Sequence, residues 1–413
     1  MLRRREIWSY AAGDFGFNTV WQSIELYLLF YYIRQLGIAP AVASSIFLAG
    51  AAADWLMDVL VGVAADRLAP RVSLGAWVSF GGPLSVLILC ATFARPPVPA
   101  GYVAYYALLT YLALRCAYGI GNIPYGALTA RISADPADHL RLTGARMQAA
   151  ALGGLVAALV YALFPTEGRS GAAFALGATI LAGIAVPTFL ATTFGTRERI
   201  VPVAAGERRL GAAAGLLVRS AALRRLLATI LCAGLAVSLI NVSLLFIFDR
   251  IGEQRWGYYA ALIPALSLLL TTPLWTRAAR QIGQIATLRV AAAMLLAGAL
   301  IGTAGGGIAV ALVSVTVAIV AGQGLSVMFW SLVPATVAAC ESDTATAGFT
   351  AQIYAAATIS RKFAQVMATQ MLVLMLATPW LPVFGSMAMT GLIALLCTTF
   401  YSPLQRTTAR LAA

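Results

Sequence analysis

Long apolar runs recur along the whole 413-residue chain, and the run from about Ala41 to Ala65 shows how strongly they constrain the fold. A run of about 20 or more apolar residues is long enough to cross the hydrocarbon core of a bilayer as one helix. The chain is 61% hydrophobic and 10% charged, whereas a soluble protein carries about 25% charged residues. The composition therefore predicts an all-α, multi-pass integral membrane protein and argues against a soluble domain.

The apolar runs divide into twelve predicted spans, six on each side of a basic stretch from Arg197 to Arg225. Arginines gather in the connections on one side of this layout, which the positive-inside rule places in the cytoplasm. We therefore expect two six-helix halves, residues 1–195 and 226–413, with a basic cytoplasmic connecting loop over 196–225 and both termini cytoplasmic. Two such halves resemble the major facilitator architecture, in which the binding site lies near the midplane between the halves.

Several function classes find no support in the sequence. The five cysteines are scattered and the single histidine lies in a polar loop, so neither a disulfide framework nor a metal cluster is predicted. No nucleophile with a base and no phosphate-binding loop indicates an enzyme. The net charge of +13 is better explained as orientation charge on loops than as a nucleic-acid surface. We expect no cofactor, no nucleic-acid partner and a monomer in a lipid bilayer.

Two carboxylates, Asp54 and Asp58, interrupt the predicted second span. Residues four apart share one face of a helix, about one turn from each other. A carboxylate in the membrane interior costs on the order of 3 kcal/mol on insertion scales, so the pair indicates an ion pathway or an ion pair between helices. Lys362, the chain's only lysine, lies in the predicted eleventh span next to Arg361. An ammonium can titrate and exchange partners, whereas a guanidinium stays protonated, which makes Lys362 a candidate partner.

Two polar stripes are predicted to face the protein interior, because lipid does not tolerate them. In the first span Asn18 and Glu25 lie on one helical face, and in the fourth span the polar residues step by three, four and three. Two structural alternatives stay open for these residues: Glu25 pairs with Arg115 or Arg146, or Arg115 pairs with Asp14 or Glu25. The fourth-span stripe consists of Arg115, Tyr118, Asn122 and Tyr125.

Several motifs now resemble a known family, the glycoside–pentoside–hexuronide cation symporters, which are the melibiose-permease group of the major facilitator superfamily. The resemblance covers all twelve spans and is strongest in the first half, where the first span follows the family pattern without a gap. It implies a coupling cation, Na⁺ or H⁺, at Asp54 and Asp58. The matching motifs are Asp54-x-x-x-Asp58, the loop motif formed by Gly62, Asp66 and Arg67, Asn122-Ile123-Pro124-Tyr125, Arg146 and Lys362.

The resemblance implies cation-coupled symport of a sugar or related organic solute across a bacterial inner membrane by alternating access. Family galactoside transporters carry aspartates where this chain has Asn18 and Asn122, and an aromatic residue at the position of Gly126. A pocket with fewer carboxylates and more cations favours an anionic solute. A proton-coupled efflux transporter and a lysolipid transporter of the same fold stay open as alternatives. The candidate substrate-binding residues are Asn18, Glu25, Arg115, Tyr118, Asn122, Arg146, Trp330 and Lys362.

Overall fold

The computed structural model describes residues 2–68, 71–95, 97–133, 136–163, 171–200, 220–304, 307–341, 350–377 and 385. Within these ranges the chain is helical and contains no strand. Nine of the described helices are long and apolar enough to cross a membrane, with α9 and α10 counted together as one of the nine. The nine do not include the predicted first and eleventh spans, and only residue 385 of the predicted twelfth span is described, so the twelve-span layout and the cytoplasmic termini stay predictions.

The chain forms two compact units. Unit 1 comprises residues 1–205 and 254–265, and unit 2 comprises residues 206–253 and 266–413. The main helices of unit 1 are α1 (Arg4–Gln22), α2 (Pro40–Leu68), α3 (Leu74–Phe93), α4 (Val103–Ile132), α5 (Pro136–Leu163), α6 (Ala172–Gly195) and α9 (Gln254–Ala260). Those of unit 2 are α8 (Ala221–Arg250), α10 (Ile263–Ile282) from residue 266 onward, α11 (Gln284–Thr303), α12 (Gly307–Glu341) and α13 (Thr350–Ala377).

The first span does not remain α-helical over its whole length. After α1 the backbone continues as two π-helical segments, η1 (Ser23–Leu28) and η2 (Tyr31–Gln35). The chain then turns at Gly37, whose φ of 68° is the left-handed conformation that glycine adopts without steric cost. The next helix begins at Pro40, where the missing N–H of proline costs nothing because the first turn of a helix has no intrahelical partner for it.

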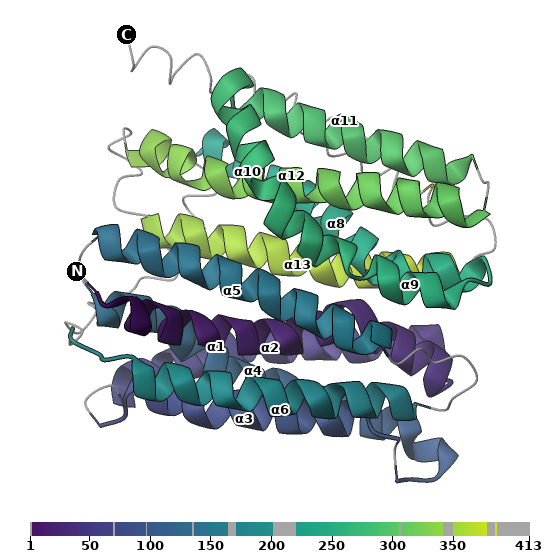
Figure 1. Ribbon diagram of the computed structural model, residues 1–413, viewed down its shortest axis with the longest axis horizontal. Coiled ribbons are helices and arrows are strands. Elements are labelled where there is room, and N and C mark those ends of the chain that lie inside the picture. The colour runs from purple at the N-terminus through teal and green to yellow at the C-terminus, as the bar shows by residue number, and fades with distance from the viewer. Residues whose placement is uncertain are drawn as a thin grey trace. The chain divides into compact units, whose positions relative to one another are not determined.

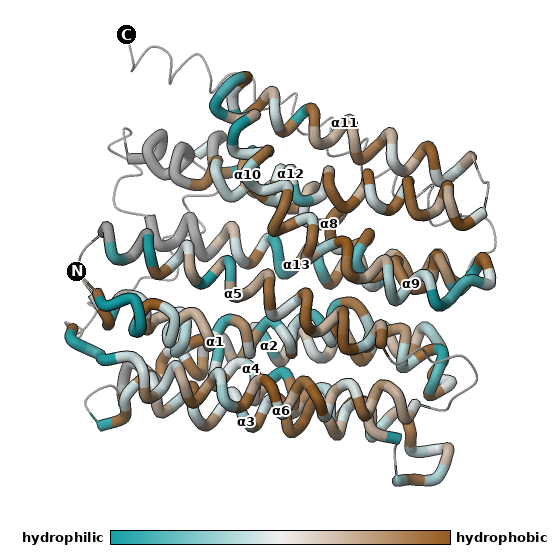
Figure 2. Tube along the Cα trace, in the orientation of Figure 1, coloured by the Kyte–Doolittle hydropathy of each residue, from teal (hydrophilic) through white to brown (hydrophobic). Residues whose placement is uncertain are grey.

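In unit 1, α1 lies against α5 and α6, α3 lies against α4 and α6, and α2 lies against α4 (Figure 1). Small residues permit these close approaches, as in other membrane helix pairs. A Cβ on Gly81 of α3 would collide with the backbone of Gly121 on α4, and one on Gly153 of α5 would collide with the backbone of Phe15 on α1. Figure 2 shows hydrophilic residues at the start of α1 and in the segment after α6, and mostly apolar residues along α6.

Residues 254–265 belong to unit 1 although they follow α8 in the sequence. Their helix α9 contacts α5, and the Tyr258 ring stacks on the fully buried Tyr27 ring at 6.1 Å with an interplanar angle of 8°. Tyr161 and Phe174 complete this aromatic cluster, with ring centroids 4.4 and 6.5 Å from that of Tyr27. In unit 2, α8 lies against α12 and α13, and α11 lies against α12.

Candidate functional site

A buried ion pair joins α2 to α4 inside unit 1. The Nη2 atom of Arg115 lies 2.7 Å from Oδ2 of Asp54, and each side chain is 8% exposed. The sequence predicted a partner for Arg115 in the predicted first span, either Asp14 or Glu25. The structure pairs Arg115 with Asp54 and Asp14 with Arg146, while pairing of Arg115 with Glu25 stays a prediction. Arg115 reaches Asp54 because α2 packs directly on α4, and helical spacing alone does not reveal which helices are neighbours.

The Arg115 guanidinium also lies against two aromatic rings. Its Cζ atom is 5.2 Å from the Trp21 ring centroid and 5.9 Å from that of Tyr111. Its buried Nε has no hydrogen-bond partner among the described residues. The Trp21 indole Nε1 in turn donates a hydrogen bond of 2.7 Å to Oε2 of Glu25. Two carboxylates, one on α2 and one in η1, are therefore connected through one guanidinium and one indole ring.

A second ion pair joins α1 to α5. The Nε atom of Arg146 lies 3.1 Å from Oδ2 of Asp14, with side chains 34% and 7% exposed. The Arg146 Cζ is 5.2 Å from the Tyr125 ring centroid, and the Asn18 amide donates to the backbone oxygen of Asp14 at 2.9 Å. Asp14 and Trp21 were not predicted as site residues. The signal for both is their spacing, because Asp14, Asn18, Trp21 and Glu25 step by four, three and four along one helical face.

The remaining predicted residues of unit 1 lie near these pairs or on α2. The Tyr118 ring centroid is 5.5 Å from that of Phe17 and 5.9 Å from that of Trp21, and Asn122 is half-buried one turn further along α4. The side chain of Asp58 is not among those described, although its backbone belongs to α2.

The predicted loop motif is not in a loop. Gly62, Asp66 and Arg67 belong to the last turns of α2, which continues to Leu68, and the side chains of the two charged residues are not described. The helix extends this far because the first proline after it is Pro70, and the position before a proline is where helices commonly end. The motif therefore lies at the end of a helix.

Two predicted residues belong to unit 2. Trp330 on α12 is 37% exposed and its ring lies 5.5 Å from that of Phe329, while Lys362 on α13 is half-buried. Their participation in one site with the residues of unit 1 stays a prediction.

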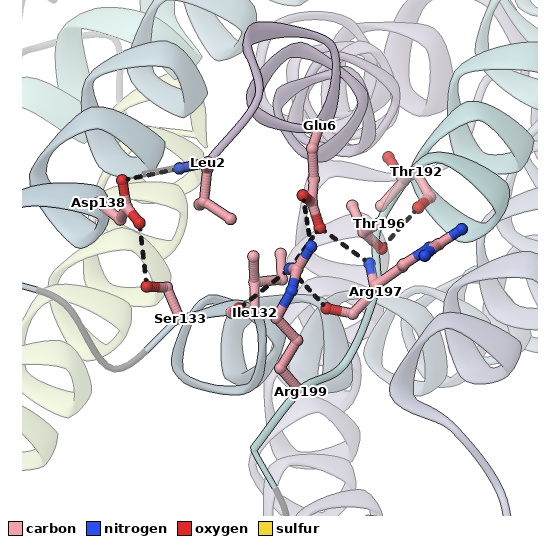
Figure 3. A network of polar contacts seen from close by, with 9 residues as sticks. All are labelled: Leu2, Glu6, Ile132, Ser133, Asp138, Thr192, Thr196, Arg197 and Arg199. Atoms are coloured by element: carbon pink, nitrogen blue, oxygen red, sulfur yellow. Dashed lines mark hydrogen bonds and ion pairs between the residues drawn. The ribbon is translucent and has the colours of Figure 1, made fainter.

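A third polar cluster ties the N-terminus to the end of unit 1 at which α4 ends and α5 begins (Figure 3). The Glu6 carboxylate accepts two hydrogen bonds from the Arg199 guanidinium, at 2.7 and 2.9 Å, and one of 3.1 Å from the Arg197 amide. Nearby, Asp138 accepts from the Leu2 amide at 3.3 Å. Burial alone would raise the pKa of Glu6, but the hydrogen bonds from Arg199 and Arg197 and their charges hold it below its usual value. This cluster fastens the segment that follows α6 to the start of α1.

A buried ion pair between two helices long enough to cross a membrane fits a multi-pass membrane protein. The MFS/sugar transport protein family matches residues 9–378, so the chain belongs to that family. The family resemblance predicted from the motifs is thereby confirmed. The matching family model describes transport proteins, and several relatives are named as symporters.

Curated relatives include symporters. The chain is 32% identical to the uncharacterized symporter YnaJ of Bacillus subtilis (strain 168) over 197 residues, which are 46% of this chain and 42% of the relative. It is 27% identical to the glucuronide carrier protein homolog of Escherichia coli (strain K12) over 351 residues, which are 80% of this chain and 74% of the relative. For YnaJ and the Escherichia coli inner membrane symporter YicJ, the chain spans less than half of the relative's length.

Solved structures show the same fold at low sequence identity. A bacterial homolog of the human lysosomal transporter Spinster, in an inward-facing and unoccupied conformation, matches with a TM-score of 0.69 at 11% identity, over 99% of both chains. A POT family transporter in complex with a thioalcohol-conjugated peptide matches with a TM-score of 0.69 at 14% identity, over 98% of this chain and 96% of the other. These likenesses concern the fold alone, which is the all-helical major facilitator fold.

Proposed function

We propose that this chain is a cation-coupled symporter that carries a sugar derivative, and in particular an anionic one, across a bacterial inner membrane by alternating access. The observation that carries the proposal is the carboxylate of Asp54, whose side chain is 8% exposed, in a helix long enough to cross the membrane. The names of the relatives support symport, and YicJ is named an inner membrane symporter.

The substrate class follows from Arg146. Its Nε side is occupied by Asp14, while about a third of its side chain stays exposed. The two Nη groups of an arginine can bind a carboxylate or a sulfonate through two parallel hydrogen bonds. Asn18 lies beside this pair and Asn122 lies on α4, and amides bond sugar hydroxyls without contributing charge. The glucuronide carrier protein homolog, which aligns with 80% of this chain, supports an anionic sugar derivative as substrate.

Coupling requires only that the cation and the solute bind more tightly together than separately, and thermodynamic linkage makes this effect reciprocal. In the proposed mechanism Asp54 and Asp58 supply the cation site, and Gly62, Asp66 and Arg67 act in the conformational change. Rocking of the two halves then exposes the site to each side in turn. Trp330 and Lys362 are proposed to contribute from the second half.

Uptake into reconstituted vesicles tests the proposal. A glucuronide, a neutral glucoside, a sulfosugar and a lysophospholipid would each be offered with an inward Na⁺ gradient, an inward H⁺ gradient or neither. We expect the glucuronide to accumulate with one gradient, and Asp54→Asn and Asp58→Asn to abolish the accumulation. Movement that ignores both gradients and both variants would show a uniporter, and the proposal of symport would be abandoned.

A lysolipid is the second candidate substrate because of one relative. The mouse sodium-dependent lysophosphatidylcholine symporter 1 is 27% identical over 153 residues, which are 36% of this chain and 29% of the relative. Lysophospholipid uptake in the same vesicles, without glucuronide uptake, would favour this candidate.

A further inference from the structure

We propose that Arg115 is a resident counter-cation of Asp54, which the coupling cation must displace, and that the displaced guanidinium moves across the Trp21 ring toward Glu25. This inference rests on the proposed function, because it explains how cation binding is sensed. It makes Arg115 a determinant of cation affinity, whereas the sequence predicted a substrate-binding residue.

The ion pair between Arg115 and Asp54 is buried. Arg115 and Asp54 are each 8% exposed, and their closest atoms are 2.7 Å apart. The single negative charge of Asp54 is therefore already neutralised by a partner within the same unit. A second cation at the same carboxylate would lie beside the guanidinium, and like charges in a medium of low dielectric constant repel strongly. Tight binding of a coupling cation at Asp54 thus requires the guanidinium to withdraw.

The Trp21 ring and Glu25 offer the guanidinium a place to which it can withdraw. The Trp21 ring centroid is 5.2 Å from the Arg115 Cζ, and aromatic faces attract guanidinium groups. The N–H edge of the same indole is hydrogen-bonded to Glu25, so a second carboxylate lies at the rim of the ring that the guanidinium already covers. The buried Nε of Arg115, which has no hydrogen-bond partner in the described part of the chain, would gain one if the side chain turned toward an acceptor.

The face of the first span that carries Trp21 and Glu25 links the cation site to the solute. Trp21 and Glu25 lie on the same face of the first span as Asn18, which is next to the Asp14–Arg146 pair. Glu25 also lies in the π-helical segment Ser23–Leu28, and π-helical turns occur frequently at functional sites. A solute bound on this face changes the surroundings into which the guanidinium moves. The cation and the solute would then affect each other's affinity without touching, with Trp21 as a positioning residue.

The test compares five variants by the Na⁺ concentration and the pH that give half-maximal glucuronide uptake, with choline replacing Na⁺ as the control. Arg115→Gln removes the resident charge, Arg115→Lys keeps it, and the double variant Arg115→Gln with Asp54→Asn removes both charges. Arg141→Gln is the matched control, because it removes an exposed arginine that pairs with Asp138 at 3.5 Å. Size-exclusion profiles and circular dichroism establish that each variant is folded.

We expect Arg115→Gln to raise the apparent cation affinity at least about ten-fold, which is about 1.4 kcal/mol or one pH unit. Arg115→Lys should shift it in the same direction by a smaller factor, so the proposal remains testable if the glutamine variant does not fold. The double variant should not respond to cations, and Arg141→Gln should match the wild type. Trp21→Phe should reduce the cation's effect on glucuronide affinity.

The outcomes separate this inference from the proposed function. If the wild type is cation-driven and Arg115→Gln behaves like Arg141→Gln, the inference is overturned while the symporter stands. If the wild type moves solute without any cation response and Arg115→Gln gains one, the inference is supported while wild-type symport is not. If neither protein responds to Na⁺ or H⁺, both are wrong.

Discussion

Replacing Arg146 by glutamine should weaken the binding of an anionic sugar far more than that of its neutral analogue. The arginine is held at its Nε by the buried Asp14 and exposes about a third of its side chain. Its removal has two consequences for an anion. The bidentate hydrogen bonds are lost, and the Asp14 carboxylate is left without its partner close to the incoming charge.

Both consequences can be given a magnitude. Hydrogen bonds to charged groups contribute about 1.5–3 kcal/mol. An anion bound on the far side of the guanidinium would lie about 7 Å from the Asp14 carboxylate, where unscreened repulsion amounts to about 2 kcal/mol at an effective dielectric constant of about 20. The sum is about 4 kcal/mol, or on the order of a 1,000-fold loss of affinity for the anion. A neutral glucoside experiences neither the lost charge nor the repulsion and should lose less than about ten-fold.

The double variant Asp14→Asn with Arg146→Gln makes the prediction sharper. It removes the repulsion and keeps only the loss of hydrogen bonds, so it should bind the anion about 30-fold more tightly than Arg146→Gln alone. The assay is competition binding of a glucuronide and the matched glucoside to purified protein. If the single variant weakens both ligands equally, or if the double variant binds the anion no better than the single one, then Arg146 does not contact the solute and the reasoning fails.

Three further predictions concern stability and local opening. Glu6→Gln should lower stability at pH 7 by about 1 kcal/mol, less than a fully buried charged pair because the Arg199 side chain is 46% exposed. In the folded protein the pKa of Glu6 lies below its usual 4.5, so the stabilisation is complete above pH 4.5 and is lost as the pH falls below it. If the thermal unfolding curves of the wild type and Glu6→Gln stay apart at low pH, the assignment is contradicted. Gly81→Ala should cost at least about 2 kcal/mol in thermal unfolding, because its Cβ would meet the backbone of α4, whereas Gly183→Ala, with open space around it, should change stability by less than about 0.5 kcal/mol. Tyr258→Ala should speed amide exchange in residues 254–265 by about ten-fold, because the buried Tyr258 ring packs this segment against Tyr27. Trp256→Ala, which removes an exposed ring, should leave the exchange rate unchanged.

The sequence predicts the class and family of this protein well because those properties depend on local patterns. An apolar run must cross the membrane as a helix wherever it lies in the fold, since lipid satisfies no backbone hydrogen bonds. The family motifs are likewise short and contiguous, as in the Asp54 and Asn122 segments. Neither inference requires knowledge of which helices are neighbours.

The partners of the charged side chains could not be predicted because they depend on helix neighbours. Periodicity shows that Arg115 lies on the polar face of its helix, but only the contact of α2 with α4 brings Asp54 to it. In the same way, Asp14 meets Arg146 because α1 lies against α5. The packing of residues 254–265 within unit 1 depends on tertiary contacts between aromatic rings, which hydropathy does not reveal.

Helix α1 contacts the arginines of both ion pairs, and this bears on how coupling would work. Helix α1 provides Asp14 as the partner of Arg146. Seven residues later, on the same helical face, it provides the Trp21 ring that lies against Arg115. A solute held by Arg146 would therefore act on α1 from α5. A cation held by Asp54 on α2 would act on the same helix through Arg115 on α4. Segment η1 begins two residues after Trp21 and contains Glu25, so in the proposed mechanism an adjustment there would change the surroundings of Arg115 while Asp14, two turns earlier, stays in place. In the proposed mechanism, coupling thus resides in the first span, and the cation and the solute need no direct contact.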